Sequence, residues 1–121
     1  ISWNAKYTGD TKNNKCHGIG EIKFQNGNFY KGEFKNGSLT GKGKYVFYNG
    51  NVYEGNFLNG FAHGSGFFKW EDGGSYEGNY KNGNYHGEGV MNYTNGNIAS
   101  GDWIDGLITN GTFKWVNGDF F

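Results

Sequence analysis

Tyrosine recurs in this sequence at a fixed interval of 23 residues. The series consists of Tyr7, Tyr30, Tyr53 and Tyr76, and Ala99 stands at its fifth position. Glycines recur two, seven, eleven, thirteen and twenty residues after these positions, which accounts for 23 of the 24 glycines and leaves only Gly74. Because self-similarity at a fixed period is typical of proteins whose units pack on their neighbours, the chain is predicted to be a repeat protein.

The glycines are expected to have a structural role. Glycine supplies 24 of the 121 residues and proline none, which in an irregular sequence would indicate a flexible linker. Aromatic residues make up 20% of the chain and are interleaved with the glycines. Disordered chains are poor in aromatics, so we expect a folded array whose buried surface comes mainly from Phe, Tyr and Trp.

Each unit carries the pattern of a two-stranded hairpin. It reads Tyr-x-Gly-x-aromatic, a glycine-bearing loop, Gly-x-Gly, and an alternating run that ends in Asn-Gly or Asp-Gly. The alternation indicates strands, and pairs such as Asn26-Gly27 and Asn36-Gly37 supply the positive φ of tight hairpin turns. The prediction is an all-β fold of ten short antiparallel strands.

This unit resembles the MORN (membrane occupation and recognition nexus) repeat. The resemblance is clearest in Tyr53-Glu54-Gly55-Asn56-Phe57 and His63-Gly64-Ser65-Gly66, and it covers essentially the whole chain. It implies one domain over residues 1–121, an elongated, open-ended, solenoid-like rod of five stacked β-hairpin repeats.

The expected unit boundaries follow the tyrosine series. The units are 7–29, 30–52, 53–75, 76–98 and 99–121, and residues 1–6 are a remnant strand or a cap. The end units depart from the pattern, as terminal repeats commonly do. The departures are Thr11 and Asn14 in the first unit, and Ala99 and a one-residue deletion between Gly106 and Thr109 in the fifth.

The array is expected to be a single layer. At about 4.8 Å between strands, ten strands form a twisted ribbon roughly 45 Å long. Gly64 and Gly66 share a face with Phe68 and Trp70, so glycine is expected to make room for aromatic rings that stack in columns from unit to unit. The opposite face is expected to be solvated, and it carries Lys42, Lys44, Glu54, Lys69, Glu77 and Glu88.

MORN proteins are generally interaction modules, often at membrane–cytoskeleton junctions. The resemblance therefore implies a cytoplasmic, non-enzymatic scaffold associated with the cytoskeleton or a membrane. The aromatic columns either pack the core, which is favoured as their sole role, or line a groove that binds a helix or extended peptide of a partner protein. The groove hypothesis predicts contacts at Tyr53, Phe57, Phe68, Trp70, Tyr76, Tyr80, Tyr93, Trp103 and Trp115.

Charge is unevenly distributed along the chain. Residues 1–44 hold eight of the eleven lysines against three acids, and the remainder holds three lysines against eight acids. This is either scattered solvated charge or a functional gradient. A gradient favours end-to-end homo-oligomers, as an alternative to association through the groove, or contact with an anionic phospholipid membrane through Lys31, Lys35, Lys42 and Lys44. The absence of arginine argues against nucleic-acid recognition.

The candidate catalytic residues have structural explanations. His17, His63 and His86 take the same place in their units, so we expect them in successive loops rather than around a metal. Cys16 lacks the neighbours of a catalytic nucleophile. We therefore expect no enzyme activity, metal or cofactor. A remaining alternative is that the array is a targeting appendage of an enzyme whose catalytic domain lies outside this chain.

Overall fold

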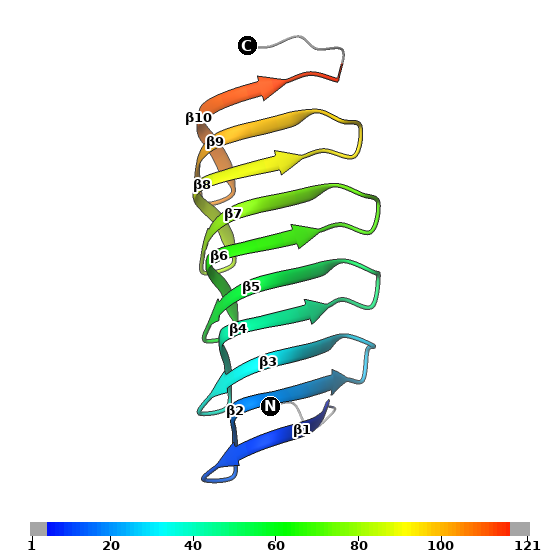
Figure 1. The fold of residues 1–121 in the computed structure, drawn as a ribbon, viewed down its shortest axis with the longest axis vertical. Helices are drawn as coiled ribbons and strands as arrows, with labels where there is room; N and C mark the ends of the chain where they lie inside the picture. Colours follow the sequence, from blue (N-terminus) through cyan, green and yellow to red (C-terminus); the bar gives the residue numbers. More distant parts are fainter. Residues whose placement is uncertain (1–4, 117–121) are drawn as a thin grey trace.

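Residues 5–116 form one antiparallel sheet of ten strands in the computed structural model (Figure 1). The strands are β1 (Ala5–Lys12), β2 (Lys15–Phe24), β3 (Phe29–Lys35), β4 (Ser38–Val46), β5 (Val52–Leu58), β6 (Phe61–Lys69), β7 (Ser75–Lys81), β8 (Asn84–Asn92), β9 (Ile98–Ile104) and β10 (Leu107–Lys114). Spatial order follows chain order, and the sheet is open and elongated. The predicted all-β array of five hairpins is confirmed.

The predicted cap or remnant strand lies mostly outside the described residues. Residues 1–4 and 117–121 are not described, and residues 5 and 6 belong to β1.

A row of glycines crosses the middle of every strand. Gly32 pairs with Gly43, and Gly43 pairs in turn with Gly55. The full row is Gly9, Gly20, Gly32, Gly43, Gly55, Gly66, Gly78, Gly89, Gly101 and Gly111. A Cβ added at Gly66 would lie 2.6 Å from Cε1 of Tyr53. The tyrosine ring therefore occupies the space that a side chain at this position would need, as the sequence predicted.

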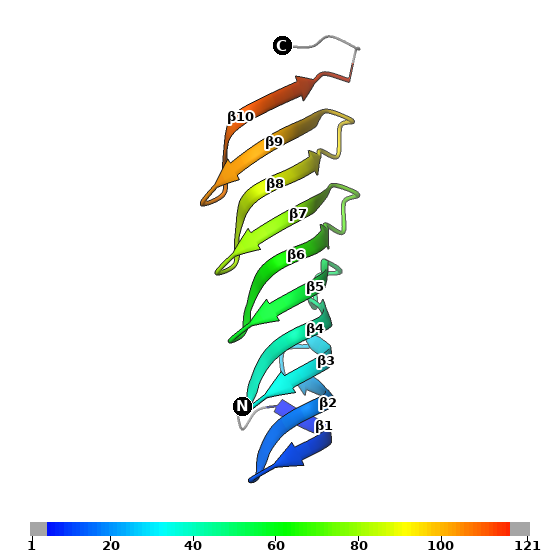
Figure 2. The same ribbon diagram turned by 60° about the vertical axis from the view of Figure 1, so that its left-hand side comes forward.

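The hydroxyl of each tyrosine in the 23-residue series donates to a backbone carbonyl at a β-bulge. Pairing shifts between Gly32/Gly43 and Phe34/Leu39, so three residues of β4 lie opposite the single residue Glu33 of β3. The Tyr30 hydroxyl donates to the Glu33 carbonyl at 2.9 Å. The same bond joins Tyr53 to Asn56 at 2.8 Å and Tyr76 to Asn79 at 3.1 Å. Figure 2 shows the even-numbered strands curving toward the short turns.

The aromatic residues form a continuous ladder along the sheet. Successive rings meet edge to face, with centroids 5.0–5.6 Å apart and interplanar angles of 80–90°. The order is Tyr7, Phe34, Tyr30, Phe57, Tyr53, Tyr80, Tyr76 and Trp103. Such pairs contribute about 0.5–1.5 kcal/mol each beyond area burial, so the ladder takes the place of a central core.

The fifth unit absorbs its deletion in the bulge. Between Ile108 and Asn110 the register shifts by one extra residue, whereas the other units accommodate two. Ala99 stands in place of the tyrosine and is fully buried. The space above Gly111 is taken instead by Ile108, whose Cδ1 lies 2.8 Å from a Cβ built there.

The two kinds of turn use glycine differently. At the short turns both residues have positive φ, for example Asn36 at 49° and Gly37 at 88°, which matches a type I′ turn. At the longer turns only the glycine does, for example Gly27 at 99°. The pair Asn26-Gly27 thus supplies its positive φ through the glycine alone, and the Asn26 carboxamide oxygen accepts the backbone N–H of Asn28 at 2.9 Å in an Asx turn.

Two buried tyrosine hydroxyls lead to opposite predictions. Tyr53→Phe removes the donor to the Asn56 carbonyl, so the free energy of unfolding should fall by about 1–2 kcal/mol. The Tyr80 hydroxyl is buried and makes no hydrogen bond to any residue of 5–116. Tyr80→Phe removes that unpaired group and should leave stability unchanged or raise it by about 1 kcal/mol. Urea unfolding followed by tryptophan fluorescence measures both, and equal losses would contradict the assigned bonds.

The buried phenols also predict alkaline unfolding. Burial, as the largest cause, raises the pKa of Tyr30, Tyr53 and Tyr76 to about 12. In the unfolded chain these phenols titrate near their ordinary value of 10.0. Their contribution is therefore complete below pH 10 and is lost as pH rises from 10 to 12. Urea midpoints measured at pH 8–12 should show this fall, and Tyr53→Phe should show a smaller one.

Candidate functional site

Five of the nine predicted contact aromatics are buried inside the array. Tyr53, Phe57, Tyr76, Tyr80 and Trp103 are between 0 and 7% exposed. Their rings pack against one another, and the Trp103 indole N–H donates to the Gly89 carbonyl at 3.1 Å. Buried side chains offer a partner no contact area, so these five do not line an open groove. Their place in the structure is the core, the role that the sequence favoured.

The other four predicted aromatics lie toward the longer turns. Phe68 and Trp70 are half-buried, and Tyr93 and Trp115 are 44% and 36% exposed. A second set of ring contacts follows this side of the sheet from Phe24 through Tyr45, Phe47 and Phe68 to Trp70. These four therefore remain candidates for contact with a partner.

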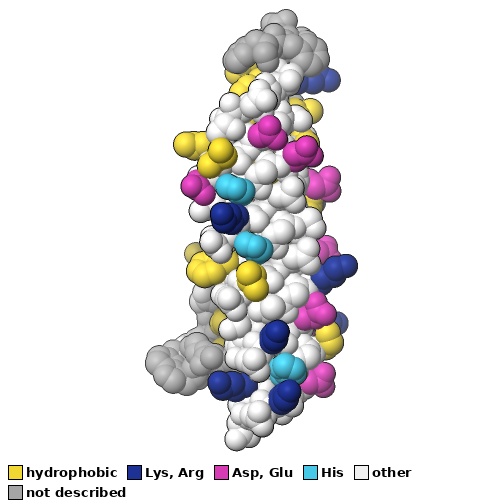
Figure 3. Space-filling model, turned by 90° about the vertical axis from the view of Figure 1, so that its left-hand side faces the viewer, with side chains coloured by type: hydrophobic (Ala, Val, Ile, Leu, Met, Phe, Trp, Pro, Cys, Tyr) yellow, Lys and Arg dark blue, Asp and Glu magenta, His cyan; other side chains and the backbone are white. Residues whose placement is uncertain are grey.

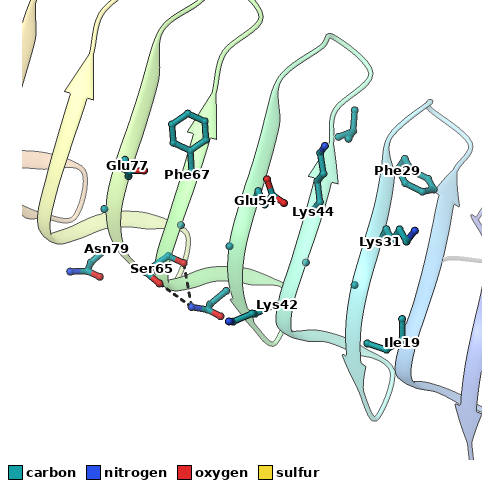
Figure 4. A pocket seen from close by; sticks show the side chains of 17 residues that line it. Ile19, Phe29, Lys31, Lys42, Lys44, Glu54, Ser65, Phe67, Glu77 and Asn79 are labelled. Carbon is teal, nitrogen blue, oxygen red and sulfur yellow. Dashed lines mark hydrogen bonds between the residues drawn. The ribbon is translucent and has the colours of Figure 1, made fainter.

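An open groove of about 1020 Å³ lies on the face opposite the aromatic ladder. Its floor is the backbone of the glycine row, from Gly32 to Gly78. Its walls are the side chains immediately before and after those glycines, and Figure 4 shows them in two rows. The sequence predicted only a solvated face here, because a bend at the glycine row cannot be deduced from alternation alone.

One wall of the groove is divided by charge. Neighbouring strands place Lys31 opposite Lys44, and Lys44 opposite Glu54. Phe67 follows next to Glu54, and Glu77 follows Phe67. Lys31 Nζ is 3.8 Å from Glu21 Oε1, with 65% of the lysine side chain and 39% of the glutamate side chain exposed. The wall therefore carries two adjacent lysines over β3 and β4, and two carboxylates around an aromatic ring over β5 to β7.

The second wall lies on the side of the bulges. Lys42 in β4 pairs with Asn56 in β5, and the Asn56 amide donates to Ser65 Oγ at 3.1 Å (Figure 4). Asn79 in β7 continues this wall. Lys42 adds a third positive charge to the half of the groove that already holds Lys31 and Lys44.

Three of the four predicted lipid-contact lysines line the groove. Lys31, Lys42 and Lys44 do so, whereas Lys35 pairs with Ser38 beside the short turn and is not part of it. Phe67, at 38% exposure, was not singled out from the sequence. Its strand position, on the same face as Glu54 and Glu77, was the signal that could have identified it.

The histidines connect neighbouring short turns. The backbone N–H of Asn36 donates to His17 Nδ1 at 3.3 Å, and that of Asn82 donates to His63 Nδ1 at 3.3 Å. In the fourth unit His86 Nδ1 lies 3.9 Å from Asp105 Oδ1. All three histidines are visible in Figure 3, which views the array from the edge that carries the short turns. Among residues 5–116 no three His, Cys, Asp or Glu side chains gather in a metal-binding arrangement.

Cys16 is buried at 2% exposure, and burial is the largest cause raising the pKa of its thiol. A nucleophilic cysteine needs a lowered pKa and access to solvent, and Cys16 has neither property.

In the part of the chain that the structure describes, no helix is long and apolar enough to cross a membrane.

These features define a protein built from stacked hairpins whose faces offer surfaces rather than an enclosed pocket. The sequence matches the MORN repeat over residues 7–29, 30–52, 53–75, 76–98 and 110–120. The chain belongs to the MORN repeat family. MORN repeats are non-catalytic and generally serve as binding or scaffold modules. No curated protein matches the chain significantly.

Proposed function

We propose that this array is a protein-binding scaffold whose main contact surface is the glycine-floored groove. The groove crosses β2 to β7, about 24 Å at the usual strand spacing, which is the length of about seven residues of an extended peptide. The proposed ligand is an extended segment of a partner protein. The aromatic face, on which the sequence-based proposal rested, contributes at most the rim residues Phe68, Trp70, Tyr93 and Trp115.

The observation that carries this proposal is the division of charge in the groove. Lys31, Lys42 and Lys44 favour acidic residues of the ligand, and Glu54 and Glu77 favour basic ones. Phe67 between the two carboxylates offers an apolar contact. A ligand with one acidic and one basic half is therefore the best match.

A second candidate is peripheral binding to anionic phospholipid. The same three lysines favour it, because they lie close together on one face. Glu54 and Glu77 on that face oppose it, since they would approach the lipid phosphates together with the lysines. Protein binding is therefore the leading proposal, and it is also the role that a targeting appendage of an enzyme, with its catalytic domain outside this chain, would need.

The test uses labelled peptides of about eight residues. One has an acidic half and a basic half, and the other has the same composition with alternating charges. Fluorescence anisotropy should show tighter binding of the first peptide. The Lys42→Glu/Lys44→Glu variant should weaken this binding at least about tenfold, because it places acids beside the acidic half of the ligand.

The matched control is Lys12→Glu/Lys15→Glu. It makes the same change in net charge at the first short turn, outside the groove, and should leave peptide binding nearly unchanged. Equal binding of both peptides, or equal effects of both variants, would refute the groove. The lipid candidate would instead be supported if the native array sediments with vesicles of phosphatidylserine and phosphatidylcholine and the Lys42→Glu/Lys44→Glu variant does not. Loss of a native partner on Trp70→Ala alone would favour the aromatic rim.

A further inference from the structure

The longer turns are tied to one another by asparagine side chains. Asn28 Oδ1 accepts the backbone N–H of Tyr48 at 2.8 Å. Asn51 accepts that of Glu71 at 2.9 Å, and Asn97 accepts that of Val116 at 2.8 Å. In the third unit the corresponding residue is Gly74, the one glycine outside the repeat pattern. The side chain that links neighbouring turns elsewhere is therefore missing between the third and fourth units.

A cavity of about 240 Å³ lies where that side chain would be. Trp70 and Tyr93 line it together with Met91, which is 8% exposed. The ring contacts that follow this side of the sheet extend as far as Trp70, whose ring centroid lies 4.8 Å from that of Phe68. The cavity thus has two aromatic residues and a buried methionine among its walls.

Oxygen atoms converge on the same position. A Cβ built on Gly74 would lie 3.2 Å from the Asn92 carbonyl oxygen, 3.3 Å from Thr94 Oγ1 and 3.6 Å from Asp72 Oδ1. Asp72 takes the place held by Asn26, Asn49 and Asn95 in the other units, so this turn alone among the four carries a carboxylate there. The hydrogen bond from the Gly74 N–H to Asp72, with a further one from Thr94, lowers the pKa of this carboxyl.

We propose that this cavity, the Gly74 gap, binds an arginine side chain of a partner protein. A planar guanidinium stacks on aromatic rings and donates several hydrogen bonds in one plane, which matches Trp70 and Tyr93 beside three oxygen atoms. Asp72 supplies the opposite charge. The site lies on the aromatic side of the sheet and does not depend on the glycine-floored groove.

The test follows the backbone amide and tryptophan indole N–H resonances of the full chain by NMR in a titration with N-acetyl-arginine methylamide. Saturable shifts are expected at Trp70, Gly74, Tyr93 and Thr94. The citrulline analogue, which has nearly the same shape without the charge, should produce no saturable shifts there, with ionic strength matched by NaCl. Binding should weaken as salt is raised, because part of the attraction is between exposed charges.

Two variants test separately the charge of Asp72 and the space left by Gly74. Asp72→Asn keeps the turn, because asparagine accepts the same backbone N–H in the other units, and should weaken arginine binding by about tenfold or more. Gly74→Asn places a side chain in the cavity and should also abolish the shifts, with thermal unfolding as the check on its fold. The matched control, Asn49→Asp, introduces a carboxylate where Asn51 already fills the space, and should create no second site.

The proposal is overturned if the citrulline analogue binds as well as the arginine analogue. It is also overturned if Asp72→Asn leaves binding unchanged, or if shifts spread over the acidic surface without saturating at Trp70 and Tyr93. Each of these results leaves the groove proposal untouched, since the peptides used there are tested against lysine variants on the opposite face.

Discussion

The structure depends on the contact between a tyrosine ring and the glycine in the next strand. Because the glycine has no Cβ, the ring of Tyr30, Tyr53 or Tyr76 occupies the space that a side chain there would need, and its hydroxyl donates to a carbonyl at the bulge. A phenylalanine would fill the space without satisfying that carbonyl. The same contact brings the aromatic residue four positions later against the tyrosine ring, at 5.0–5.3 Å.

A sheet normally needs a second layer of structure to bury one of its faces. This sheet buries its aromatic face without a second layer. The bulge bends each hairpin so that rings from consecutive units pack edge to face. Stability is then a sum of contacts between neighbouring units, as in other repeat proteins. The consequence for function is that the aromatic face is largely closed, while the opposite face has its backbone close to the surface along the glycine row and becomes the groove.

Repeat proteins acquire specificity where a unit departs from the pattern, because the regular positions are committed to folding. Two such departures define the proposed sites. The change from Lys31 to Glu54 and Glu77 at the equivalent places, together with Phe67 in the place of Lys44, divides the groove by charge. Gly74 and Asp72, in place of two asparagines, open a cavity between turns that are otherwise tied together. Neither departure affects the tyrosine–glycine contact, so both are compatible with an undisturbed array.

The sequence by itself determined the period, the ten strands, their order and the position of every glycine in the row, because these follow from local alternation and turn chemistry repeated five times. It also placed Lys44, Glu54 and Glu77 on one face. What only the tertiary structure decided is which face is open. The answer depends on the bend at the bulge, where three residues oppose one. It also depends on the packing between rings of consecutive units, such as Tyr53 and Tyr80. These are properties of packing between units, which strand alternation does not encode.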